Sequence, residues 1–175
     1  MTADAPASPV LRVRDLSIVH DGADAPTPSG VSFDVAPGEV VLLLGPSGSG
    51  KSTLALALNG LVPHEVPARM SGSVAAGGLD TAAHRVADIS TRVGMVFQDP
   101  DAQMVTSAVL DEVAFGPENL RLPVDVVLDR SERALRRLGL WEQREDDPDR
   151  LSGGGRQRLA IAAALALDAP VLVLD

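Results

Sequence analysis

Residues 45–52 read GPSGSGKS, and this stretch determines what fold to expect. It fits the pattern G-x-x-x-x-G-K-[ST], whose glycines let the backbone wrap around a polyphosphate and point N–H groups at it. The continuous apolar run EVVLLL at 39–44 comes before it, and the Leu/Ala-rich STLALALNG at 52–60 comes after it. A buried strand, a glycine-rich loop and a helix in this order predict a phosphate-binding loop. The alternative interpretation is a Gly/Ser turn that caps an ordinary helix.

Each part of this loop has a candidate role. Lys51 would reach the β and γ phosphates of a nucleotide, and the Ser52 hydroxyl would bind Mg²⁺. The backbone N–H groups and the N-terminus of the helix would hold the remaining phosphate charge. The candidate nucleotide-contacting residues of the loop are Gly45, Pro46, Ser47, Gly48, Ser49, Gly50, Lys51, Ser52 and Thr53.

Strand patterns lie on both sides of the loop. The runs VLRVRDLSIV at 10–19 and GVSFDV at 30–35 are separated by a Pro/Gly/Ala/Asp-rich segment and predict two strands joined by a loop. GSVAAGGLD at 72–80 and TRVGMVFQ at 91–98 predict further strands. The first helix is expected to end near Gly60, because a glycine suits the left-handed cap.

Helical patterns dominate the second half of the chain. Charged and apolar residues alternate at helical spacing from about Asp125 to Gly139. RQRLAIAAALAL at 156–167 predicts a helix that ends before Pro170, and VLVLD at 171–175 predicts a second strand buried on both faces. Together these patterns predict an α/β fold with a mostly parallel central sheet.

Composition excludes several kinds of protein. The formal charge of -9 argues against free duplex nucleic acid as a partner, because such binding depends on Lys and Arg at the phosphates. The sequence contains no cysteine, so it has no disulfide or thiolate metal site, which fits the reducing cytosol. The longest apolar stretches, 40–44 and 159–167, are far shorter than the roughly 20 residues of a membrane-spanning helix. Residues 1–9 do not read as a secretory signal and are expected to form a flexible tail.

A second glycine-rich motif, LSGGG, occupies residues 151–155 and begins the helix predicted at 156–167. Taken alone it could be a serine-capped helix behind a flexible loop. Beside the loop at 45–52 it resembles the LSGGQ signature of ATP-binding-cassette (ABC) ATPases, with Gly155 in place of the usual glutamine. The resemblance implies ATP as the nucleotide and a second cassette as a partner. Ser152, Gly153 and Gly154 would then contact the γ-phosphate held by that second cassette.

The resemblance extends to three further residues. Asp175 resembles the Walker B aspartate and Gln98 the Q-loop glutamine, so Ser52, Gln98 and Asp175 are the candidate Mg²⁺ ligands and Lys51, Gln98 and Asp175 the candidate catalytic residues. The alternatives are an aspartate that starts a turn and a surface glutamine before Asp99. His20 falls where many members stack an aromatic ring on adenine, although a solvated histidine is equally compatible with the sequence.

The stretch 93–123, VGMVFQDPDAQMVTSAVLDEVAFGPENLRLP, is similar to the ATPases of energy-coupling-factor importers and their cobalt and nickel relatives. That resemblance implies a transmembrane partner, a peripheral position on the cytoplasmic face of the membrane, and uptake of a vitamin or metal ion. Asp99, Asp101 and Gln103 would border the groove that receives the partner's coupling helix. The alternative is an ordinary polar loop.

The resemblance also implies a domain organisation. It predicts a nucleotide-binding domain at 10–175, with an N-terminal antiparallel β subdomain and a helical subdomain at about 100–155. The family's glutamate after the Walker B aspartate, its D-loop and its switch histidine do not occur in these 175 residues, so we expect an incomplete C-terminus. The alternative functions are a soluble ABC-type ATPase in DNA repair, chromosome maintenance or translation, a small-molecule kinase, and a chain that only binds nucleotide.

We expect these 175 residues alone to hydrolyse ATP poorly, because positioning of the attacking water and charge stabilisation by a second cassette are both compromised. Steady-state phosphate release, compared with that of a longer version of the chain, tests this expectation. Equal turnover rates for the two versions would contradict it.

Overall fold

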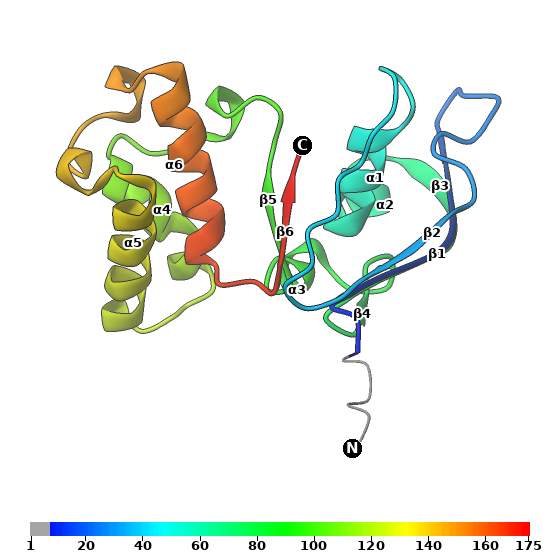
Figure 1. Ribbon diagram of the computed structural model, residues 1–175, viewed down its shortest axis with the longest axis horizontal. Coiled ribbons are helices and arrows are strands. Elements are labelled where there is room, and N and C mark those ends of the chain that lie inside the picture. The colour runs from blue at the N-terminus through cyan, green and yellow to red at the C-terminus, as the bar shows by residue number, and fades with distance from the viewer. Residues whose placement is uncertain (1–7) are drawn as a thin grey trace, which may run out of the picture. The chain divides into compact units, whose positions relative to one another are not determined.

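The computed structural model describes residues 8–175; most of the expected tail at 1–9 lies outside the described residues. The chain divides into two compact units, with the boundary between Val93 and Gly94. Figure 1 labels the elements of both units, and each unit is described by itself.

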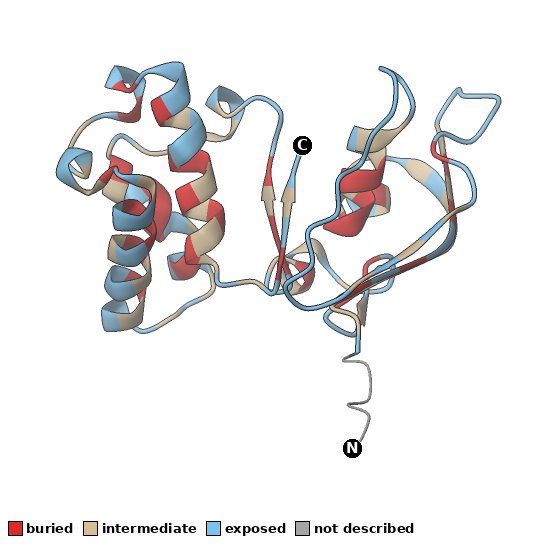
Figure 2. Cartoon of the chain, viewed as in Figure 1, coloured by how far each residue is buried: buried red, intermediate tan, exposed pale blue. Residues whose placement is uncertain are grey.

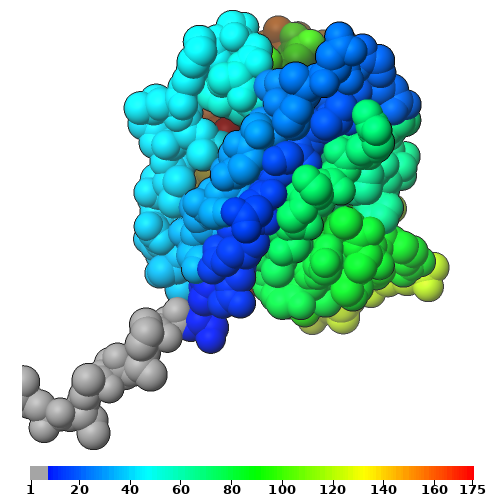
Figure 3. All heavy atoms as spheres, turned by 90° about the vertical axis from the view of Figure 1, so that its right-hand side faces the viewer, coloured from blue at the N-terminus to red at the C-terminus, as the bar shows by residue number. Residues whose placement is uncertain are grey.

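A four-stranded sheet forms the frame of the first unit. Its strands are β1 (Leu11–His20), β2 (Val31–Val35), β3 (Ala68–Ala76) and β4 (Leu79–Asp80), in the order β2-β1-β3-β4. All the neighbouring pairs are antiparallel. Figure 3 shows β1 crossing this face in dark blue, and the expected antiparallel strands of the N-terminal half are confirmed.

A bulge in the middle of β1 explains the spacing of its apolar residues. Leu11 and Val13 are buried before the bulge and Leu16 and Ile18 after it, and the pairing register shifts between Val13 and Leu16. The extra residue keeps both apolar pairs on the inner face of the sheet. Opposite the bulge, Gly72 has a φ of 81°, and a Cβ there would collide with the backbone of Arg14 and Asp15. A glycine is therefore required at this turn of the sheet.

Three short helices complete the first unit. These are α1 (Lys51–Leu58), α2 (Leu61–His64) and α3 (Val86–Ile89). Both α1 and α2 pack against β3. The helix predicted after the glycine-rich loop is confirmed, and Gly60, with a φ of 81°, lies just beyond its end as expected.

The prediction of a buried strand at 39–44 is wrong. Val40, Leu42 and Leu44 are 93%, 76% and 82% exposed, and the segment belongs to neither of the two sheets among the described residues. Figure 2 shows this part of the chain in the colour of exposed residues. An apolar run forms a buried strand only where neighbouring strands satisfy its N–H and C=O groups and other elements cover its faces. The four strands of this sheet pair with one another instead.

The second unit combines two strands with three long helices. Strands β5 (Val93–Val96) and β6 (Val171–Leu174) form a two-stranded sheet and run side by side in the same direction in Figure 1. The helices are α4 (Val109–Asn119), α5 (Val124–Leu138) and α6 (Gly153–Ala166), with single 3₁₀ turns η1 (Asp101–Gln103), η2 (Trp141–Gln143) and η3 (Pro148–Arg150) between elements.

Both strands and two of the three helices of this unit lie where the sequence patterns predicted them. The expected burial of β6 on both faces is wrong, because Leu172 and Leu174 are 39% and 61% exposed. The helix predicted to end at Gly139 ends there, at a φ of 70°. Helix α6 starts at Gly153, earlier than the pattern suggested, so the glycines of the LSGGG motif form its first turn. Helix α4 was not predicted, because Gly116 and Pro117 interrupt its apolar spacing.

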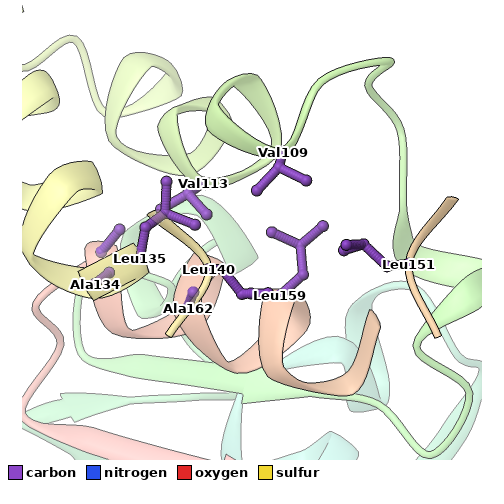
Figure 4. Packing of buried hydrophobic residues seen from close by; sticks show 9 residues of the cluster. Val109, Val113, Ala134, Leu135, Leu140, Leu151, Leu159 and Ala162 are labelled. Carbon is purple, nitrogen blue, oxygen red and sulfur yellow. The ribbon is translucent and has the colours of Figure 1, made fainter. Parts of the chain in front are cut away.

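The core of the second unit lies where the three long helices meet. Figure 4 shows the side chains of Val113 from α4, Leu135 from α5 and Leu159 from α6 pointing into one interior. The buried members of this cluster are Val109, Val113, Ala134, Leu135, Leu140, Leu151, Leu159, Ala162 and Ala166. Because Leu151 belongs to the cluster, the start of α6 is fixed to the helical core. Among the residues that the structure describes, no helix is long and apolar enough to cross a bilayer.

Replacing Leu159 by Ala should destabilise the protein by about 3 kcal/mol, because a fully buried leucine is removed from the centre of this cluster. Leu128→Ala is the matched control: the same change on α5, where the side chain is 52% exposed, should cost under about 0.5 kcal/mol. Urea unfolding followed by circular dichroism measures both. Equal losses would contradict the assignment of Leu159 to the core.

Candidate nucleotide-binding site

The glycine-rich loop at 45–50 turns directly into α1. Gly48 and Gly50 have φ values of 78° and 90°, and Gly50 is the N-cap residue of the helix. A Cβ at Gly50 would lie 2.7 Å from the backbone nitrogen of Pro28. Left-handed backbone and close approach of another chain segment both require glycine here. The path of the loop therefore depends on glycine at these positions.

The charge at the start of α1 favours an anion. Lys51 is the only lysine in the sequence, and its Nζ donates to the carbonyls of Gly45 at 3.0 Å and Pro46 at 2.9 Å. Within α1, which the structure describes in full, the first turn carries no acidic residue. The positive end of the helix dipole and the ammonium group thus act together, without a carboxylate in the first turn of α1 to cancel them.

His20, at the end of β1, lies against this helix. Its Nε2 is 3.1 Å from the Thr53 hydroxyl oxygen, and both side chains are half-buried. The structure therefore brings His20 and Thr53 together with the glycine-rich loop in one unit.

Gln98 and Asp175 follow two neighbouring strands of the second unit. The Asp175 N–H donates to the Val96 carbonyl at 3.0 Å, which places the two residues just after the carboxyl ends of β6 and β5. Both residues are exposed. This edge of paired strands is where α/β proteins hold ligands.

The LSGGG motif begins α6 in the same unit. Ser152 is the N-cap residue, and its Oγ accepts a hydrogen bond from the Gly155 N–H at 3.1 Å. Gly153 and Gly154 are exposed, and a Cβ on either would meet no described atom within 4 Å. Glycine in a helix costs up to about 1 kcal/mol relative to alanine, so internal packing does not account for these two glycines. Gly155 differs, because a Cβ there would lie 3.0 Å from the Leu151 Cβ.

The sequence patterns do not predict the role of Glu112. This residue of α4 is only 6% exposed, and its Oε2 accepts from the Val105 N–H, the Thr106 N–H and the Thr106 hydroxyl at 2.9–3.0 Å. A carboxylate with three donors fixes the segment that follows η1. The signal in the sequence was an acidic residue next to apolar positions of a helix that had not been predicted.

The oxygen-rich candidate ligands suit a hard divalent cation. Ser52, Gln98 and Asp175 offer hydroxyl, amide and carboxylate oxygens, the donors that Mg²⁺ prefers. Ser52 belongs to the first unit, whereas Gln98 and Asp175 lie in the second. Within residues 8–175, no group of three His, Cys, Asp or Glu side chains is arranged to hold a metal.

A glycine-rich loop that leads into a helix beginning with Lys and Ser defines a protein of the P-loop nucleotide-binding class. The profile of the ABC transporter family matches residues 28–175. The chain therefore belongs to the ABC transporter family. The α/β P-loop fold predicted from the sequence is confirmed, since the chain shares it with a solved ATPase subunit at a TM-score of 0.79.

That subunit is cbiO1 of Clostridium perfringens, part of the ABC transporter complex cbiONQ. It is 32% identical, with 96% of this chain and 65% of that one covered. The energy-coupling factor transporter ATP-binding protein EcfA1 of Lacticaseibacillus paracasei is 43% identical over 95% of this chain and 58% of its own length. A protein of Pyrococcus abyssi, assigned to the ATP-binding proteins of ABC transporters, is 45% identical over 95% of this chain and 59% of its own. The chain thus spans about three fifths of the length of these two relatives.

Gly50→Ala should destabilise the first unit more than Gly38→Ala does. Both glycines have positive φ, so each alanine adds strain of about 1–2 kcal/mol. Only the Cβ at position 50 also meets the backbone of Pro28, whereas that at 38 meets no described atom within 4 Å. Urea unfolding followed by circular dichroism measures the difference, and equal losses would show that the approach of Pro28 does not constrain the loop.

Proposed function

We propose that the chain is the ATP-binding part of an ABC importer ATPase, which couples ATP hydrolysis to uptake through a membrane partner. The observation that carries this proposal is the start of α1, where a left-handed glycine loop, the single lysine and a helix N-terminus without acidic residues coincide. Such a site selects a polyphosphate by charge and by backbone shape.

Each site residue has a role in this proposal. The loop N–H groups and Lys51 hold the β and γ phosphates and stabilise the charge that develops on them during hydrolysis. Ser52, Gln98 and Asp175 would hold Mg²⁺, which would neutralise phosphate charge. Gln98 also orients the attacking water, and His20 packs against the adenine.

Ser152, Gly153 and Gly154 complete the site of a second cassette. Their position at the N-terminus of α6 offers backbone N–H groups to an anion, and the lack of side chains at 153 and 154 leaves room for close approach. We propose that two cassettes, identical or sister chains, clamp ATP in this way. A soluble ABC ATPase would use the same site, but no observation favours one.

The cargo and the membrane partner are inferred from relatives. The Lacticaseibacillus paracasei relative is named for an energy-coupling factor transporter, and the Clostridium perfringens neighbour is part of an ABC transporter complex. We propose a vitamin or metal ion as the cargo. We also propose a peripheral position on the cytoplasmic face of the membrane, with the partner bound at the segment 98–103, most of which is exposed.

We further propose that residues 10–175 form one nucleotide-binding domain whose helical subdomain spans about 100–155. Its helices α4 and α5 share their core with the start of α6. A partner bound at this subdomain would thereby act on residues 152–154.

Acylation of Lys51 by an amine-reactive ester tests the proposal, because no other side chain of the sequence carries a primary amine. Mg-ATP at ten times its dissociation constant should slow the labelling of Lys51 about tenfold, since only about a tenth of the sites remain empty. Mass spectrometry measures the rate, with the N-terminal amine of the same molecules as the internal reference. Slowing by ATP but not by AMP is the expected result.

Labelling of Lys51 that is insensitive to ATP would contradict the proposal. Lys51→Ala supplies a second measurement, because loss of a charged contact of about 1.5–3 kcal/mol should weaken ATP binding by about 10- to 150-fold. Arg85→Ala is the control for general loss of positive charge, since Arg85 is exposed and pairs only with Asp88 among the described residues.

A further inference from the structure

Arg156 joins two segments that are far apart in the sequence of the second unit. Its Nε donates to Asp101 Oδ1 of η1 at 2.5 Å, and its Nη1 donates to the Leu151 carbonyl at 2.7 Å. The Arg156 side chain is 25% exposed, so its charge is partly shielded from water and its hydrogen bonds are charge-assisted. One guanidinium therefore holds both η1 and the residue that precedes Ser152.

Short-range hydrogen bonds attach η1 to the end of β5. The Phe97 N–H donates to Gln103 Oε1 at 3.1 Å, and the Asp101 N–H donates to Asp99 Oδ1 at 3.1 Å. Gln98 lies between the residues that make these contacts. A movement at Gln98 is therefore passed to Asp101 through these hydrogen bonds.

The start of α6 has few anchors of its own. Residues 153–155 are all glycine and offer no side chain, and Ser152 Oγ is already the cap acceptor for the Gly155 N–H. The anchors of this turn are Leu151, buried in the helical core, and Arg156. A glutamine at position 155 would add a polar side chain to this turn. Because this chain has Gly155 there, the polar anchor of the turn is Arg156.

We propose that the Asp101–Arg156 ion pair is a positioning link, which transmits movement of the segment 98–103 to the turn that carries Ser152, Gly153 and Gly154. This inference rests on the proposed function, because it requires the turn to contact the nucleotide of a second cassette. The link would control when that contact forms. Coupling of this kind can be carried by a chain of contacts between two sites, each of which can bind a ligand or a partner. The hydrogen bonds described above supply that connection within one unit.

The test uses the whole gene product and compares Asp101→Asn, Arg156→Gln and the exchange Asp101→Arg with Arg156→Asp. Each single change should lower kcat for ATP about fivefold or more. The ATP affinity measured by Lys51 protection should stay within about twofold, because residues of the loop at 45–52 make that contact. The exchange should recover at least half of the lost kcat. General damage to the fold would not be repaired by reversing the pair.

Arg133→Gln is the control, because it removes another Asp–Arg pair of the same unit, Asp129–Arg133 at 3.0 Å, from the exposed surface of α5. It should leave kcat unchanged. An unchanged kcat in the single variants, or an exchange no better than either single change, would overturn the link while leaving the proposed function intact.

If the wild-type protein does not hydrolyse ATP, that result counts against the proposed function alone. Hydrogen exchange then tests the Asp101–Arg156 link separately. Arg156→Gln should speed amide exchange in 98–106 and in 151–156 together, and Arg133→Gln in neither. Faster exchange in only one of the segments would show that they are not linked, and would overturn the inference.

Discussion

The left-handed turn at Gly50 is the constraint on which the site depends. It brings the chain from an irregular loop into α1 within a single residue and aims the first N–H groups of the helix at the space in front of the loop. The approach of Pro28 fixes that turn from the other side. The loop at 45–50 therefore depends on glycine at this turn and on the Lys51 side chain, which donates to the carbonyls of Gly45 and Pro46.

Much of the architecture follows from sequence pattern alone. The short apolar runs of β1 and β2, the helical spacing before Gly139 and the Ala/Leu helix before Pro170 each predicted the element that the structure contains. The glycine-rich loop and the LSGGG motif were also located correctly at helix starts. Local chemistry determines these features, since a strand, a cap or a left-handed glycine depends on few neighbours.

The failures concern contacts between distant residues. The run at 40–44 has the composition of a buried strand, but a strand exists only with partners, which composition does not specify. Gly116 and Pro117 interrupt the apolar spacing of α4, so the sequence predicted neither this helix nor the role of Glu112. Arg156 looked like a polar residue of an ordinary helix, because its partner Asp101 is 55 positions away in the sequence.

The exposed run at 40–44 also bears on how readily the protein aggregates in solution. Five consecutive uncharged Val and Leu residues that belong to neither sheet of the described residues favour β-pairing between molecules. The net charge of -9 opposes such contact through repulsion, and added salt screens that repulsion. The balance between this short apolar segment and the net negative charge of the protein therefore depends on ionic strength.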